Sequence, residues 1–178
     1  MTATEYVILV DDHDQEIGYA EKLSAHKKNL LHRAFSVFIF RKQPRLELLL
    51  QQRALKKYHS AGLWTNTCCS HPRPGENIMQ AAERRLYEEL TIKTPLQDLG
   101  WFHYNAHFQN ALSENEIDHV LLGDVPPDIS IQPHPEEVHA YRWISIEELH
   151  QEIVSHPAQF TPWLEQALAI VEKNLSIK

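Results

Sequence analysis

Cysteine and glycine are scarce in this chain, with two and five residues respectively among 178. The two cysteines, Cys68 and Cys69, are adjacent in sequence and therefore poorly placed for a relaxed disulfide, which needs a particular separation and torsion between its Cβ atoms. We expect free thiols in a reducing compartment, the cytoplasm, and no disulfide scaffold. An internal repeat and a Gly/Ser-rich linker are also missing, which predicts a single domain over residues 1–178.

Long apolar runs are missing as well. The longest, FSVFIF (35–40) and LELLL (46–50), fall far short of the roughly 18 residues of a transmembrane helix, and the start MTATEYVILVDD has no basic region or small-residue cleavage site. The 24 acidic residues outnumber the 17 Lys and Arg, and the net charge is -7. This balance argues against a general nucleic-acid binder. We expect neither a membrane nor a nucleic acid as partner, and we favour a monomer.

The first part of the chain has the short apolar runs of strands. YVILV (6–10), FSVFIF (35–40) and LELLLQQ (46–52) are rich in apolar or β-branched residues, and the turn-like RKQPR (41–45) predicts that the last two form an antiparallel hairpin. The period then changes over residues 76–90. Apolar residues recur there every four positions and predict a helix with one apolar stripe, formed by Ile78, Ala82, Leu86 and Leu90.

Further strands are predicted at 99–108, 116–125 and 138–144, followed by a helix that the capping pattern from Ser145 to Glu148 opens.

A last helix is predicted to begin near Thr161 and Pro162, with Leu164, Leu168, Val171 and Leu175 at helical spacing. The order of strands, helix, strands and two helices predicts an α+β sandwich rather than an alternating parallel sheet.

Chemistry-bearing residues gather in TNTCCSHPRPGE (65–76). A structural zinc site would need a second pair of Cys or His ligands, so we disfavour it. If residues 64–71 are extended, side chains alternate, and Cys69 shares a face with Thr67 and His71 while Cys68 points the other way beside Asn66. Cys68 is then a buried small hydrophobe. Cys69, next to a histidine and ahead of a helix, is a candidate acid, base or nucleophile.

The helical segment GENIMQAAERRLYEEL (75–90) resembles the Nudix box, a loop-helix-loop whose carboxylates hold a divalent metal on a diphosphate. Its box carboxylates are Glu76, Glu88 and Glu89. The match is incomplete, because Ser70 and Thr91 replace two box glycines and Arg85 replaces a glutamate central to metal-assisted hydrolysis. Such an exchange loses metal affinity and gains a phosphate anchor. An ordinary amphipathic helix with surface charges is the alternative.

The segment WTNTCCSHPRPGE (64–76), which contains the first of these departures, resembles the type I isopentenyl diphosphate isomerases. EKLSAHKKNLLHRAFSVFIF (21–40), LLLQQRALKKYHSAGLWTN (48–66) and SENEIDHV (113–120) are similar to three further motifs of that family, in the same order. The resemblance runs from about residue 5 to Trp163. It implies a Nudix-like sandwich of mixed or antiparallel β-sheets flanked by helices, and interconversion of isopentenyl and dimethylallyl diphosphate in isoprenoid biosynthesis.

The resemblance implies that Cys69 and Glu116 form an acid-base pair across the substrate, with Tyr104 assisting Glu116 and Trp163 facing the cationic carbon. The chemistry agrees. Protonating an unactivated alkene gives a tertiary carbocation that has to be kept dry, and thiol and carboxyl pKa values can be moved toward neutrality. An indole face stabilises a desolvated cation. A solvated carboxylate and packed aromatics are the alternatives for Glu116, Tyr104 and Trp163.

The resemblance also implies two metal ions and a diphosphate site. The residues that match the divalent-metal ligands of the family are His26, His32, His71, Glu114 and Glu116. Manganese, zinc and magnesium all suit such a set of ligands. A second ion, magnesium, is expected between the diphosphate, Glu89 and the backbone carbonyl of Cys69. The cations expected to bind the diphosphate are Lys22, Arg53, Lys57 and Arg85. We assign no ligand role to His13, His59, His103, His107 or His119.

Two other functions stay open at this point. A divergent Nudix diphosphohydrolase would act on a nucleotide and tolerate the loss of Cys69. A noncatalytic metal-binding interaction module would bind metal and turn over neither class of diphosphate.

Overall fold

The computed structural model describes residues 4–57 and 59–175. Within them, the elements in chain order are β1 (Tyr6–Val10), β2 (Glu16–Glu21), α1 (Lys22–Lys28), β3 (His32–Arg41), β4 (Glu47–Arg53), β5 (Trp64–Thr65), β6 (Cys68–Ser70), α2 (Ile78–Leu90), β7 (Gln97–His107), β8 (Ser113–Asp124), β9 (Val138–Ile144), α3 (Ile146–Ser155), the short 3-10 helix η1 (Pro157–Gln159) and α4 (Leu164–Leu175). Among the helices described, none has the length and apolar character to cross a membrane.

Strand β3 is the centre of a mixed sheet. It runs parallel to β8, with pairs from His32 and Glu116 to Phe40 and Asp124, and it runs antiparallel to β1, β4 and β6. Strands β7 and β9 extend the sheet as antiparallel neighbours of β8 and β4. The predicted hairpin of β3 and β4 and the predicted α+β class are both confirmed. The parallel pairing places His32 directly beside Glu116.

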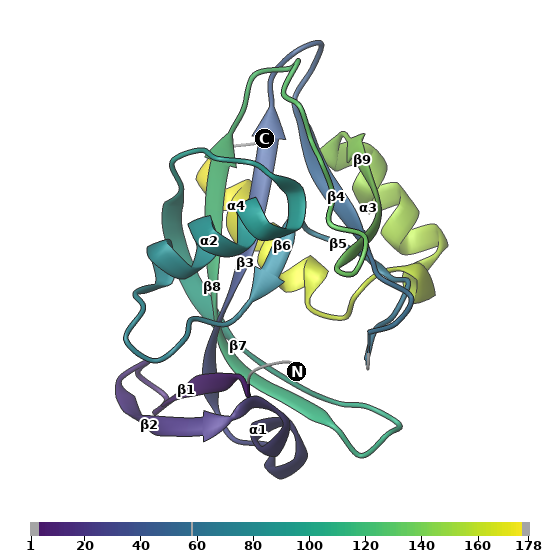
Figure 1. Cartoon of the computed structure of the whole chain (residues 1–178). Coiled ribbons are helices and arrows are strands. Elements are labelled where there is room, and N and C mark those ends of the chain that lie inside the picture. The colour runs from purple at the N-terminus through teal and green to yellow at the C-terminus, as the bar shows by residue number, and fades with distance from the viewer. Residues whose placement is uncertain (1–3, 58, 176–178) are drawn as a thin grey trace.

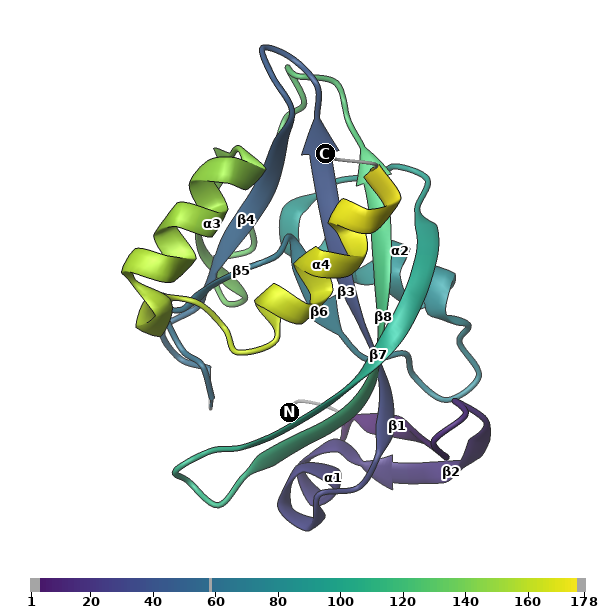
Figure 2. The same ribbon diagram turned by 180° about the vertical axis from the view of Figure 1, so that it is seen from behind.

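Both faces of the central strands are covered by helices. Helix α2 lies on one face and α4 on the other, as the two opposite views show (Figures 1 and 2). Along β3, Val37 and Ile39 belong to the core under α2, and Phe38 belongs to the core under α4. A strand buried on both faces reads as a continuous apolar run, which explains FSVFIF.

The predicted caps are present at two helices. Ser145 accepts a hydrogen bond from the backbone nitrogen of Glu148 at the start of α3, as expected. Asn77 begins α2 with a capping box formed with Gln80. Of the predicted apolar stripe of α2, Ala82, Leu86 and Leu90 are buried and Ile78 is half-buried, and the neighbouring Ala81 is buried as well.

The start of the last helix differs from the prediction, because α4 begins at Leu164. The Thr161 backbone nitrogen donates to the Trp64 carbonyl at 3.0 Å, and the hydroxyls of Thr161 and Thr65 lie 2.7 Å apart. These bonds hold Thr161 against β5, and the helix therefore begins only at Leu164. Strand β2 and helix α1 were not predicted, since β2 is largely exposed and α1 has only seven residues.

His119 joins three parts of the fold and gives a pH-dependent prediction. Its Nε2 lies 2.7 Å from Asp14 Oδ2 and its Nδ1 lies 2.8 Å from Asp98 Oδ2. Burial lowers the pKa of His119, but the hydrogen bonds to Asp98 and Asp14 outweigh burial and raise it. A raised histidine pKa stabilises the fold below the unfolded value of about 6.5, and this stabilisation is lost as pH rises through the folded pKa.

We therefore expect His119→Gln to lower the free energy of unfolding by about 1 kcal/mol at pH 6 and by clearly less at pH 9. Urea unfolding at the two pH values measures this difference, and the exposed His139 on β9 provides a control variant, His139→Gln, with no expected change. An equal loss at both pH values would contradict the charged pairing of His119.

Candidate active site

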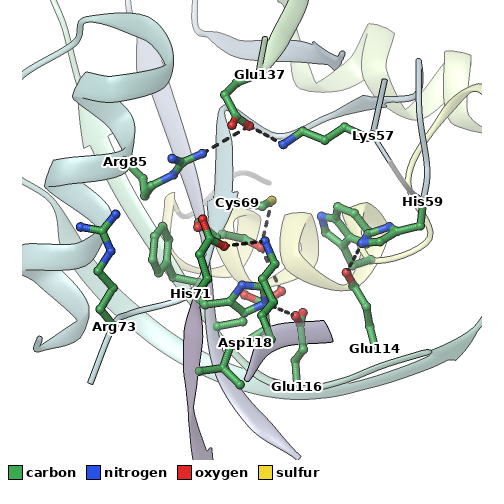
Figure 3. Close-up of a pocket in the computed structure, with 18 of the residues that line it drawn as sticks. Lys57, His59, Cys69, His71, Arg73, Arg85, Glu114, Glu116, Asp118 and Glu137 are labelled. Carbon is green, nitrogen blue, oxygen red and sulfur yellow. Dashed lines mark hydrogen bonds and ion pairs between the residues drawn. The ribbon is translucent and has the colours of Figure 1, made fainter. Parts of the chain in front are cut away.

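A cavity of about 110 Å³ brings together residues that are far apart in the sequence. Cys69, Glu116 and Trp163 all line it, so three of the four predicted catalytic residues share one hollow. The four predicted diphosphate cations line it too, namely Lys22, Arg53, Lys57 and Arg85. Figure 3 shows Cys69 between a group of cations on one side and Glu114, Glu116 and Asp118 on the other.

The cysteine segment is bent rather than extended. Strand β5 pairs with β4 whereas β6 pairs with β3, so the chain has to turn between them, at Asn66 and Thr67. The predicted alternation holds for Cys69 and His71, which both line the cavity, and for Cys68, which points into the core, but it is wrong for Asn66 and Thr67. Cys69 Sγ donates to Asn66 Oδ1 at 3.1 Å, while the Thr67 hydroxyl points into the sheet and donates to the Leu49 carbonyl at 2.6 Å. Cys68 is fully buried in the core under α2, as predicted.

The Cys69 thiol is held in its protonated form. Burial and the nearby Asp118 carboxyl raise the pKa of Cys69 to about 12, although hydrogen bonds with Ser36 and Asn66 act in the opposite direction. Ser36 Oγ lies 3.6 Å from Cys69 Sγ and donates to Asp118 Oδ2 at 2.9 Å. The pKa of Asp118 is also raised well above its ordinary value, mainly by burial and then by repulsion from Glu116. The thiol therefore carries a proton at neutral pH.

Glu116 lies on β8 in a row of three buried acidic residues, two positions from both Glu114 and Asp118. Alternation along a strand puts the three on one face. Burial would raise the pKa of Glu116, but hydrogen bonds from His32 and His71 hold it well below the ordinary value. Asp118 was missed by the sequence reasoning, although its two-residue spacing from Glu116 was a usable signal.

Tyr104 lies beside Glu116, as the resemblance implied. The two residues face each other in the antiparallel register of β7 and β8. The ring of Tyr104 meets that of Trp163 edge to face, with centroids 5.9 Å apart. Its buried hydroxyl has no hydrogen-bond partner within the part of the chain that the structure describes. Burial, and then repulsion by the nearby acidic residues, raises the pKa of Tyr104, so this hydroxyl keeps its proton.

Three of the five predicted metal ligands form a compact group. His26 comes from α1, His32 begins β3 and His71 follows β6, and their ligand atoms lie within 4.8 Å of one another. Glu116 Oε2 is 2.8 Å from His71 Nε2 and 3.3 Å from His32 Nε2. Glu116 therefore contacts two of the three histidines of the group.

The histidines are oriented as metal ligands require. His26 Nδ1 donates to the Ser113 carbonyl at 2.8 Å and His32 Nδ1 to the Leu30 carbonyl at 2.9 Å. Because a carbonyl oxygen only accepts, each Nδ1 carries a proton, so Nε2 is the atom that each ring presents to a metal. Burial lowers the pKa of His32, but the contact with Glu116 outweighs burial and raises it. Burial lowers the pKa of His26 and of His71 to about 4, which favours their neutral form. This donor set fits a first-row divalent ion.

The fifth predicted ligand, Glu114, has a different neighbour. Its Oε1 lies 2.7 Å from His59 Nε2, and it is outside the three-histidine group. The imidazole of His59 in turn stacks on Phe108, with centroids 4.8 Å apart. His59, to which we assigned no ligand role, thus belongs to the site through Glu114. It lies in the loop between β4 and β5, where no periodicity connects it to residue 114.

Carboxylates neutralise three of the four predicted diphosphate cations. Lys22 Nζ lies 3.1 Å from Glu5. Glu137 contacts both Lys57 and Arg85, as Figure 3 shows. The sequence reasoning missed Glu137, which directly precedes β9.

The fourth cation, Arg53, lies against the aromatic wall instead. Its guanidinium carbon is 5.6 Å from the centre of the Trp163 ring.

The box carboxylates divide into two kinds. Glu76 accepts hydrogen bonds from Arg84 at 2.8 and 2.9 Å, and Glu88 pairs with both box arginines. Glu89 is the buried one. It accepts from Gln51 at 2.8 Å and from Arg85 at 2.7 Å, and it lines a second, smaller cavity together with Cys69 and Glu137.

Comparison with solved structures shows the fold. The Deinococcus radiodurans protein DR0079 superposes with a TM-score of 0.71 at 18% identity, covering 93% of this chain and 99% of that one. A MutT protein from Methanosarcina mazei superposes with a TM-score of 0.63 at 18% identity, covering 81% and 95%. Residues 30–164 also match the NUDIX domain as a sequence family.

Comparison with curated proteins shows the family. Isopentenyl-diphosphate Delta-isomerase of Pectobacterium atrosepticum is 48% identical over 172 residues, which covers 95% of this chain and 92% of that protein. The protein of the same name from Photobacterium profundum is 46% identical over 179 residues and covers 99% of both. With the NUDIX match over most of its length, the chain belongs to the isopentenyl-diphosphate Delta-isomerase family.

Proposed function

We propose that this protein interconverts isopentenyl and dimethylallyl diphosphate. The observation that carries the proposal is that Cys69, Glu116 and Trp163 line one cavity whose other side holds Lys57 and Arg85. Such a cavity suits a small molecule with an apolar, reactive end and a charged tail. The two free thiols support a cytoplasmic location.

The reaction requires one proton to be added to the substrate and another to be removed from it. In either direction, one of Cys69 and Glu116 protonates an alkene carbon, and the other removes a proton from a different carbon, so the net change is a shifted double bond. The tertiary cation formed between the two steps faces the π density of Trp163. The Tyr104 hydroxyl keeps its proton and can donate to Glu116 during the transfer. Burial excludes the water that would trap the cation.

Two ions complete the proposed site. His26, His32, His71, Glu116 and Glu114 would hold manganese, zinc or magnesium, whose charge would favour ionised Glu116. Glu89 and the Cys69 carbonyl would hold a second ion, magnesium, next to the diphosphate.

One assay tests this function against the two alternatives. Purified protein and Mg²⁺ are incubated with isopentenyl diphosphate, and separately with a panel of nucleotides, while product and released phosphate are followed. We expect dimethylallyl diphosphate without phosphate release. Phosphate or pyrophosphate released from a nucleotide would identify a Nudix diphosphohydrolase instead. Retained metal without any turnover would identify a binding module.

Glu137 gives a prediction about the diphosphate site. Its carboxylate lies against Lys57 and Arg85, where the substrate's negative charges are proposed to bind. Glu137→Gln removes that repulsion, so metal-free pyrophosphate should bind about tenfold more tightly, measured by titration calorimetry. The exposed neighbour Glu136 supplies the matched control, Glu136→Gln, with no expected change. Unchanged pyrophosphate affinity in Glu137→Gln would place the diphosphate elsewhere.

A further inference from the structure

The buried side chain of Asn66 connects two of the proposed functional groups. Its Oδ1 accepts hydrogen bonds from Cys69 Sγ at 3.1 Å, from Trp163 Nε1 at 3.2 Å and from Thr65 Oγ1 at 2.8 Å. Asn66 is fully buried and Trp163 is 4% exposed. The thiol and the indole, which lie almost a hundred residues apart in the sequence, therefore share a single acceptor atom.

The orientation of the Asn66 amide is fixed by its other end. Nδ2 donates to the carbonyls of Val37 at 3.1 Å and Cys68 at 3.0 Å. Carbonyl oxygens only accept, so the nitrogen has to face β3 and β6 and the oxygen has to face Cys69 and Trp163. A flipped amide would set its NH₂ group against the indole N–H, which only donates. The direction of Oδ1 is thus set by the backbone of two strands.

We infer that Asn66 is a positioning residue for this active site, which fixes the direction of the Cys69 thiol and the tilt of the Trp163 ring relative to each other. The inference rests on the proposed function of Cys69 and Trp163. A proton-transfer group and a cation-stabilising ring are proposed to act on one small substrate, so their relative placement affects the rate. A misplacement of about 1 Å can cost on the order of a hundredfold in rate.

The first test is Asn66→Ala. We expect kcat to fall about a hundredfold with little change in KM, because diphosphate binding uses other residues. The indole N–H signal of Trp163 in the NMR spectrum should move as its hydrogen bond is lost, and Trp163→Phe assigns that signal among the four tryptophans. The three other indole signals report whether the variant is folded. The distant helix cap Ser145 supplies a destabilised control, Ser145→Ala, with kcat unchanged.

The second test leaves Asn66 in place. Cys69→Ala removes the S–H donor to Asn66 and should move the Trp163 indole signal, whereas Cys68→Ala, in the core under α2, should leave that signal in place. A folded Asn66→Ala variant with native kcat, or a Trp163 signal that stays unchanged in Cys69→Ala, would overturn the inference. If the native protein isomerises nothing but the signal still responds, the proposed function fails while the shared acceptor stands.

Discussion

Replacement of Cys69 with alanine is expected to lower the kcat for isopentenyl diphosphate by about a thousandfold or more and to leave the protein folded. The reason is that general acid-base groups contribute on the order of 10² to 10⁴ in rate, and the Cys69 thiol is one of only two proposed proton-transfer groups in the cavity. The variant keeps the cations and the histidine group, so substrate and metal should still bind. Steady-state kinetics and circular dichroism measure the two parts of this result.

The adjacent cysteine supplies the matched control. Cys68 has the same side chain but is fully buried in the core under α2. Cys68→Ala should cost some stability through lost packing while kcat stays within about threefold of the native value. Native turnover in Cys69→Ala, or equal losses in the two variants, would show that the sulfur of Cys69 takes no part in the reaction.

The second large effect is expected at Glu116. Glu116→Gln removes both a proposed proton-transfer group and a carboxylate that lies within 3.3 Å of two histidines. We expect kcat to fall about a thousandfold, and added Mn²⁺ should not restore it, because an amide cannot replace the acid-base group.

Glu114→Gln separates the two roles of such a carboxylate. Glu114 lies on the same strand face but is proposed only as a metal ligand. Its amide variant should weaken Mn²⁺ binding about 10- to 100-fold, measured by equilibrium dialysis, and should regain turnover when Mn²⁺ is raised. If Mn²⁺ rescued Glu116→Gln as well, Glu116 would be a metal ligand and nothing more.

Local patterns in the sequence predicted much of the fold. The run FSVFIF has the continuous apolar character of a strand buried on both faces, and the period of residues 76–90 predicted α2. The parallel pairing of β3 with β8, which brings His32 beside Glu116, joins segments more than 80 residues apart. No local pattern encodes such a pairing, and only the family resemblance connected the two residues.

The site was less predictable where neighbours come from irregular segments. The bend at Asn66 arises because β5 and β6 pair with different strands, and this long-range choice reversed the expected faces of Asn66 and Thr67. His59 and Glu137 reach the cavity from loops, where spacing carries no information about direction. Asp118 could have been found, because it continues the two-residue spacing of Glu114 and Glu116.

The most direct test of proton transfer between Cys69, Glu116 and the substrate is the reaction in deuterated water. Protein and Mg²⁺ are incubated with isopentenyl diphosphate in D₂O, and the product is examined by NMR. The account predicts dimethylallyl diphosphate with solvent deuterium in the methyl group formed from the terminal methylene carbon, and no labelled product from Cys69→Ala. Unlabelled dimethylallyl diphosphate, or the same labelling from Cys69→Ala, would contradict it.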